Sequence, residues 1–316
     1  MAAPLLQRWF LQAVPVRELP LAADALATPE QQAEVLRLTI HHASQRTRAV
    51  AREYARAFVK RLTVLCEQAG HEVGEELCGA YVELLAAGDA AADLSASFSH
   101  KTYLLDGLDA PPLVLCESRQ LVSDGTTGLH AWEAAAALAE WVVAAARADR
   151  GLWAGRTVLE LGAGVGLVGL VAARAAPQLA RVVLTDVHEQ VLRVLRANAA
   201  DTDRVDVQPL DWLDPGAADG WLPAADPDVL LGSDLVYDRD IIPALVQVLA
   251  RLLRAPGRLR TALIASTQRN QATLDQFLAA LADADIAVDE VELPPPALFY
   301  RPPAAVVFLH RLAVRQ

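Results

Sequence analysis

The sequence has few cysteines, no basic block and no long apolar run. Its three cysteines, Cys66, Cys78 and Cys116, share no C-x-x-C or His-paired spacing, so we expect reduced thiols of an intracellular protein. No uncharged apolar stretch reaches about 18 residues, which argues against a membrane-spanning helix. The formal net charge of -11, without a basic-aromatic array, argues against direct binding of nucleic acid. These absences favour a cytoplasmic protein, which we expect to be a monomer.

The composition is that of a folded chain with room for more than one domain. Of its 316 residues, 53% are hydrophobic and 21% are charged. Apolar residues recur at spacings of three and four over residues 22–87, which predicts helices. We therefore expect a helical N-terminal domain, residues 1–94, and a second domain, residues 95–316. Residues 1–17 carry arginines and no acid until Glu18, which is typical of either a mitochondrial presequence or an amphipathic helix that packs on the body.

The second domain reads as an α/β fold. Residues 103–105 and 113–117 predict a hairpin, and from Thr157 short apolar runs alternate with helical patterns. Residues 293–303 hold five prolines and leave no room for a helix, so the two strands that they join should pair antiparallel. We predict a seven-stranded, mostly parallel Rossmann-like sheet with an antiparallel last strand. Its expected strands are residues 157–161, 182–185, 205–207, 229–233, 261–266, 287–291 and 305–311.

A glycine-rich turn follows the first strand of this sheet. The strand ends at Leu161, and Gly162, Gly164 and Gly166 let the backbone bend sharply and approach a ligand without a Cβ in the way. The helix that follows would direct its N-terminal amides at that ligand. The pattern G-x-G-x-x-G also fits dinucleotide binding, so a nicotinamide oxidoreductase is a competing interpretation.

Glu160 favours a different ligand. It stands at the strand end, just before the first glycine. A carboxylate there would repel an anionic pyrophosphate, whereas it would attract the ammonium of a methionine moiety. Glu160 therefore favours S-adenosylmethionine over a dinucleotide, with a solvated acid at the sheet edge as the alternative.

Other polar residues stand at the ends of later strands, where an open parallel sheet binds its ligand. Asp186 can accept both ribose hydroxyls, or it caps the next helix. Trp212 can stack on adenine and Trp132 can roof the pocket, or either can be a core residue. Asp234 and Tyr237 leave the fourth strand three residues apart, a spacing that brings both to one side of a turn, although Asp234 could also be a helix cap.

Taken together, Glu160-Leu-Gly-Ala-Gly-Val-Gly166, Asp186, Leu210-Asp-Trp212 and Asp234-Leu-Val-Tyr237 resemble a known family. It is the seven-β-strand class of protein-lysine methyltransferases, in the Asp-x-x-Tyr group called methyltransferase family 16. The likeness spans roughly residues 103–312. Within the family, it is greatest to the members that methylate elongation factor 2.

The resemblance implies a role for each matched residue. Asp234 and Tyr237 would be catalytic and face the incoming lysine. Ser233 replaces an expected alanine and is small enough to keep the pocket open. No metal is implied. The cofactor S-adenosyl-L-methionine would be bound by Trp132, Glu160, Gly162, Ala163, Gly164, Asp186, Trp212 and Ser233.

The function expected from these residues is transfer of methyl groups from S-adenosylmethionine to a lysine of a translation factor, elongation factor 2. Three alternatives remain open from the sequence. The chain could methylate another protein or a small molecule, or it could be a non-catalytic binding module with the same fold. The sequence fixes neither the lysine nor the number of methyl groups.

Overall fold

The computed structural model describes residues 2–86, 97–120, 126–214, 216, 219, 225–257, 259 and 262–315. The chain forms two compact units. Residues 1–106 with 111–120 make the first, and residues 107–110 with 121–316 make the second. The boundary expected at residue 94 lies outside the described residues, and the units divide instead after the hairpin that the sequence analysis assigned to the second domain.

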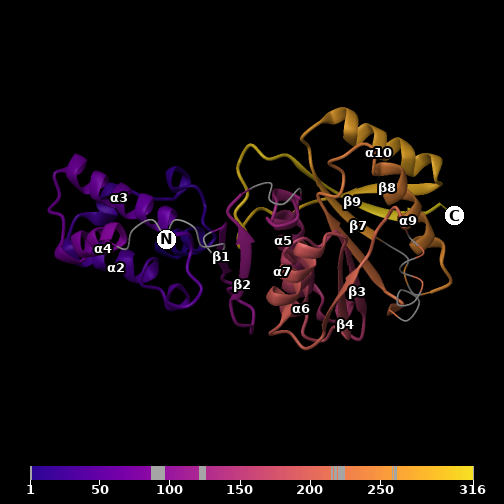
Figure 1. Cartoon of the computed structure of the whole chain (residues 1–316), viewed down its shortest axis with the longest axis horizontal. Helices are drawn as coiled ribbons and strands as arrows, with labels where there is room; N and C mark the ends of the chain where they lie inside the picture. The colour runs from indigo at the N-terminus through magenta and orange to yellow at the C-terminus, as the bar shows by residue number, and fades with distance from the viewer. Residues whose placement is uncertain are drawn as a thin grey trace. The chain divides into compact units, whose positions relative to one another are not determined.

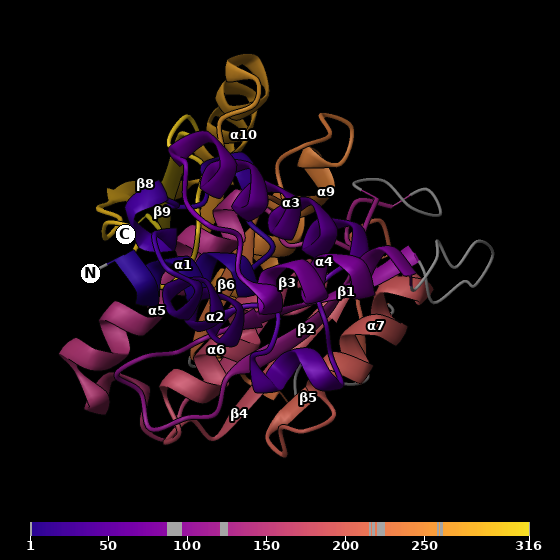
Figure 2. The ribbon, with the colours of Figure 1, turned by 90° about the vertical axis from the view of Figure 1, so that its left-hand side faces the viewer.

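The first unit is mainly helical. Thr28 begins α2 with a capping box: its side chain accepts from the backbone N–H of Gln31, whose side chain accepts from the Thr28 N–H. Helices α3 and α4 run side by side (Figures 1 and 2). The ring of Phe10 lies 4.6 Å from that of Phe58, so α1 packs against α3 as an amphipathic helix. The helices are α1 (Ala2–Leu11), α2 (Pro29–Leu38), α3 (Arg52–Ala69) and α4 (Glu75–Ala86), with 3-10 turns at Val16–Glu18, Ala23–Leu26 and Ala43–Arg46.

A hairpin of β1 (Phe98–Tyr103) and β2 (Leu113–Ser118) completes the first unit. Its first strand begins five residues before the segment that the sequence analysis assigned to it. Glu117 is buried in this hairpin but not unpaired. Lys101 Nζ lies 2.9 Å from its Oε2, and the Tyr103 hydroxyl donates to its Oε1 at 3.2 Å. The two contacts satisfy a carboxylate that would otherwise be strongly disfavoured in the interior.

The second unit holds the seven-stranded sheet predicted from the sequence, in the order β5-β4-β3-β6-β7-β9-β8. β9 runs antiparallel to both of its neighbours, as expected for the last strand, and the other pairs are parallel. β3 is central and wholly buried, which agrees with its run of apolar residues. The strands are β3 (Thr157–Leu161), β4 (Arg181–Asp186), β5 (Val205–Pro209), β6 (Val229–Ser233), β7 (Ala262–Thr267), β8 (Ile286–Val291) and β9 (Val307–Val314).

Helices cover both faces of this sheet. Figure 1 shows α5, α6 and α7 on one side and α9 and α10 on the other. This division follows from the strand order, because right-handed crossovers that run outward from β3 in opposite directions place their helices on opposite faces. None of the described helices is both long and apolar enough to cross a membrane. The helices are α5 (Glu133–Ala148), α6 (Leu167–Ala175), α7 (Glu189–Ala199), α9 (Ile242–Arg254) and α10 (Gln271–Asp283), with a 3-10 turn at Arg150–Trp153.

Candidate active site

The glycine-rich turn connects β3 to α6 in a conformation that requires glycine. Gly162 has a φ of 57° and Gly164 a φ of 54°, both in the left-handed region. A Cβ on Gly162 would lie 2.6 Å from Leu235 Cδ2, and one on Gly164 would lie 2.9 Å from the Gly128 carbonyl oxygen. The turn is therefore pressed against two other loops, and larger side chains have no room.

Glu160 lies at the end of β3, where only 1% of it is exposed. Its Oε2 accepts a hydrogen bond from the Gly169 N–H of α6 at 2.8 Å. Burial raises the pKa of this carboxyl to about 8, and the nearby negative charge of Asp186 adds to the rise. Without a ligand, Glu160 is therefore mainly protonated at neutral pH. A protonated Glu160 would not repel a pyrophosphate, and the attraction for an ammonium that we inferred from the sequence requires that the bound cation lower this pKa and ionise the carboxyl.

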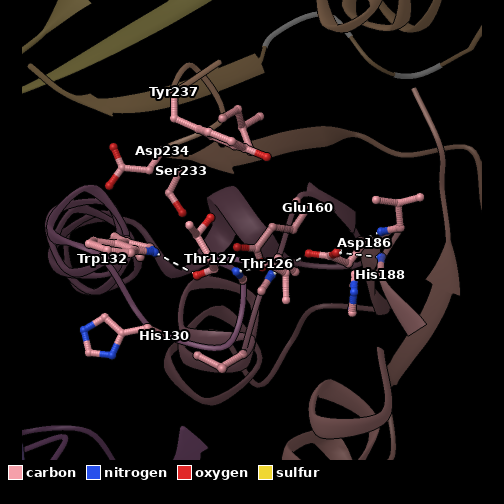
Figure 3. Close-up of a pocket in the computed structure, with 18 of the residues that line it drawn as sticks. Thr126, Thr127, His130, Trp132, Glu160, Asp186, His188, Ser233, Asp234 and Tyr237 are labelled. Atoms are coloured by element: carbon pink, nitrogen blue, oxygen red, sulfur yellow. Dashed lines mark hydrogen bonds between the residues drawn. The ribbon is translucent and has the colours of Figure 1, made fainter. Parts of the chain in front are cut away.

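Asp186 ends β4 and faces the same turn. Its Oδ2 accepts from the Gly164 N–H at 3.1 Å, while its Oδ1 accepts from the Val187 and His188 N–H groups at 2.8 and 3.2 Å. Burial raises the pKa of Asp186, although these hydrogen bonds oppose the rise. Figure 3 shows Asp186 at one side of the cavity and Asp234 at the other, with Glu160 between them.

Asp234 follows β6 with a φ of 49°, which is uncommon for a residue other than glycine. Its Oδ1 accepts from the Thr267 N–H at 2.8 Å, and its Oδ2 accepts from the Thr267 hydroxyl at 3.0 Å. Oδ2 also accepts from the Ala134 N–H, in the first turn of α5, at 3.4 Å. Burial raises the pKa of Asp234, and the contacts with Thr267 lower it. These contacts tie the end of β6 to β7 and α5.

Two indole rings and a phenol complete the predicted set. Trp132 precedes α5 and donates its Nε1–H to the Thr127 carbonyl at 3.0 Å. Trp212 packs against the apolar core beside the turn at Gly162. Tyr237 is 61% exposed, so its ring lies at the rim. The three side chains are thus available as apolar walls for a planar or cationic group.

These side chains surround one cavity of about 550 Å³ within the second unit, a size typical of small-molecule sites. All ten residues predicted from the sequence line it: Trp132, Glu160, Gly162, Ala163, Gly164, Asp186, Trp212, Ser233, Asp234 and Tyr237. Carboxyl groups, backbone amides and indole rings around one hollow suit ribose hydroxyls, an ammonium and a purine. The residues present therefore fit S-adenosylmethionine. Among the described residues, no cluster of His, Cys, Asp and Glu is placed to hold a metal ion.

Several residues that line the cavity were not predicted from the sequence. Arg269 follows β7, and its guanidinium carbon lies 4.8 Å above the centre of the Trp132 ring. The rule that points to the carboxyl ends of strands could have found it, because β7 lies next to β6. The same rule applies to His188, two residues after β4 ends, but it does not reach the loop ahead of α5, which follows no strand of the seven-stranded sheet. The other missed residues include Thr126, Thr127, Gly128, His130 and His188.

Comparison with known proteins identifies the family. The lysine methyltransferase family matches residues 115–284. The protein-lysine N-methyltransferase EEF2KMT of Bos taurus is 34% identical over 284 residues, which cover 82% of this chain and 79% of that protein. EEF2KMT of Homo sapiens is 33% identical over 301 residues, covering 89% and 87%. The protein-lysine N-methyltransferase EFM3 of Chaetomium thermophilum is 33% identical over 264 residues, covering 77% and 76%. This chain therefore belongs to the lysine methyltransferase family and is an S-adenosylmethionine-dependent protein-lysine methyltransferase.

Proposed function

We propose that this enzyme methylates a lysine of elongation factor 2. The observation that carries the proposal is the extent of the match to EEF2KMT, which covers 89% of this chain for the human protein. A match confined to the cofactor-binding fold would say nothing about the substrate, because one fold serves many substrates. Here the match is longer than the second unit alone, so it includes surface outside the cofactor-binding fold.

We propose that the turn at Gly162, Ala163 and Gly164 holds the amino-acid part of S-adenosylmethionine. Its φ angles and tight packing bring the backbone of the turn, rather than large side chains, to the wall of the cavity. Glu160 lies beside the same turn, where a bound ammonium would lower the pKa of its carboxyl and pair with the resulting carboxylate. When bound, S-adenosylmethionine supplies a methyl group activated by a sulfonium charge.

In the same proposal, Asp186 binds the ribose hydroxyls and Trp212 stacks on the adenine. Asp186 is already fixed by backbone amides on both oxygens, so its carboxylate is held in one orientation toward the cavity. Trp132 and Ser233 lie at the end of the cavity opposite Asp186 (Figure 3), where they line the space between the cofactor and the acceptor lysine. This division places the transferred methyl group close to Asp234.

At that end, Asp234 orients the acceptor lysine, and Tyr237 lines the opening through which the lysine side chain enters. A free lysine has a pKa near 10.4, so its amine must lose a proton before it can attack. Asp234 cannot remove that proton outright, because a carboxylate is a far weaker base than an amine. Asp234 Oδ1 accepts the Thr267 N–H and can accept one more hydrogen bond, which can come from the lysine amine and align it. Alignment is the main task of the enzyme in such a displacement.

A direct test measures the intact mass of purified elongation factor 2 after incubation with S-adenosylmethionine and the enzyme. We expect a gain of one or more methyl groups with the wild type and none with Asp234→Ala. An unchanged mass with the wild type would refute this substrate. The same enzyme and labelled cofactor in a whole-cell extract distinguish the alternatives: one labelled protein of the size of this factor, several labelled proteins, or labelled small molecules only.

We also propose that the enzyme acts in the cytoplasm as a monomer, without direct contact to nucleic acid or membrane. Its formal net charge of -11 would repel a phosphate backbone. Size-exclusion chromatography with light scattering tests the monomer.

A further inference from the structure

Arg269 contacts two side chains that line the acceptor end of the cavity, Asp234 and Trp132, and an acid outside the lining, Glu133. Its Nη2 lies 2.6 Å from Glu133 Oε2 and 3.7 Å from Asp234 Oδ2. The guanidinium carbon lies over the Trp132 ring, 4.8 Å from its centre. It is therefore held by an acid at the start of α5, by the residue after β6 and by the indole between them. The side chain remains 47% exposed, so solvent reaches one side of it.

The charges around this point are unevenly distributed. Of the described residues that line the cavity, Arg269 is the only arginine or lysine. The acids nearest to Arg269 are Asp234 and Glu133, and the other oxygen of Asp234, Oδ1, accepts the Thr267 N–H. Removing Arg269 would leave these two acids without a cation from the cavity wall. The other titratable groups that line the cavity are His130, Glu160, Asp186, His188, Asp211 and Tyr237.

We propose that Arg269 is a positioning residue for methyl transfer, which acts through its charge: it offsets the charge of Asp234 and keeps the acceptor lysine in its neutral, nucleophilic form. This inference rests on the proposed function, in which the lysine amine approaches Asp234. A cation beside that amine disfavours its ammonium form, and it also neutralises the Asp234 charge that would favour the ammonium. Both effects lower the pKa of the acceptor amine. More of the bound lysine can then attack near neutral pH.

Coulomb's law gives the size of the effect. A unit charge about 7 Å away, at an effective dielectric constant of about 30, shifts a pKa by about one unit. Without Arg269, the pH at which kcat reaches half of its maximum should therefore rise by about one unit. At a pH well below that midpoint, kcat should fall about tenfold, whereas at high pH it should approach the wild-type value.

The test is the pH profile of kcat for methylation of elongation factor 2 at saturating S-adenosylmethionine. The variants are Arg269→Gln, which removes the charge, and Arg269→Lys, which keeps it. Arg193→Gln is the control for loss of one positive charge: Arg193 lies on α7, its side chain is 72% exposed, and it pairs with Glu189 at 3.7 Å. Thermal unfolding and calorimetric binding of S-adenosylmethionine establish that each variant is folded and binds the cofactor.

We expect the profile of Arg269→Gln to move to higher pH, with Arg269→Lys and Arg193→Gln close to the wild type. A purely structural role would instead lower kcat by the same factor at every pH. That result, or a wild-type midpoint in Arg269→Gln, would overturn the proposal. Methylation of the factor by the wild type in the same assay checks the proposed function independently of this outcome.

Discussion

Burial of Glu160 predicts that the protein without ligand loses stability as the pH rises from about 5 to about 8. Desolvation raises the pKa of this carboxyl from 4.5 to about 8, so the folded protein keeps a proton that the unfolded chain releases. Because the pKa is higher in the folded protein than in the unfolded chain, Glu160 makes its full contribution to stability at pH values below the unfolded pKa of 4.5. That contribution is lost as the pH rises through about 8, where a carboxylate becomes buried.

The difference between the two pKa values corresponds to about 5 kcal/mol over the whole range, or about 1.4 kcal/mol for each pH unit. Between about pH 6 and pH 8.5, the contribution of Glu160 should fall by about 2.5 kcal/mol. Glu160→Gln removes the titration but keeps an oxygen that can accept the Gly169 N–H. Its free energy of unfolding should therefore depend less on pH than that of the wild type by about this amount.

Urea unfolding of both proteins at these two pH values measures the difference directly, because other titrating groups cancel in the comparison. Glu189→Gln is the matched control, since the Glu189 side chain is 90% exposed and its loss should leave the pH dependence unchanged. Equal pH dependence in the wild type and Glu160→Gln would refute the reasoning. It would mean that Glu160 is ionised in the folded protein despite its burial.

Three further predictions concern other parts of the second unit. Gly162→Arg should weaken S-adenosylmethionine binding, measured by calorimetry, by more than about 100-fold, or about 2.7 kcal/mol, because a Cβ there meets Leu235 at 2.6 Å. The control is Gly155→Arg, which should bind normally: Gly155 also has a positive φ, but nothing lies within 4 Å of its Cβ position. Asp234→Ala should abolish methylation while cofactor affinity, measured in the same way, stays within about tenfold; a methylation rate equal to that of the wild type would contradict the catalytic assignment. Glu140→Ala should destabilise the protein by about 4 kcal/mol and lower Tm by about 10 °C. The reason is that Glu140 Oε2 accepts the N–H groups of Ala297, Leu298 and Phe299 at 3.0, 2.8 and 3.0 Å. A Tm within about 2 °C of the wild type in calorimetric scans would show that other groups or water satisfy these amides.

The sequence alone determined the features that depend on local pattern. Alternating strands and helices gave the sheet, and the proline-rich segment at residues 293–303 gave its antiparallel last strand. The spacing of Gly162 and Gly164 identified a turn whose φ angles do require glycine. Because the carboxyl ends of parallel strands meet at one edge, residues as distant as Glu160 and Asp234 could be placed at one cavity before the strand order was known.

Only the tertiary structure decided which groups those residues contact. Glu160 bonds to an α6 amide, and Asp234 to Thr267, a residue of β7. Arg269 pairs with Glu133, which is 136 residues earlier in the chain. Such contacts depend on strand order and helix packing, and the pKa of a carboxyl depends on how completely those elements exclude water. No local spacing carries that information, so ten residues of the cavity could be named from the sequence and its family resemblance, while Arg269 and the charge states and partners of the acids could not.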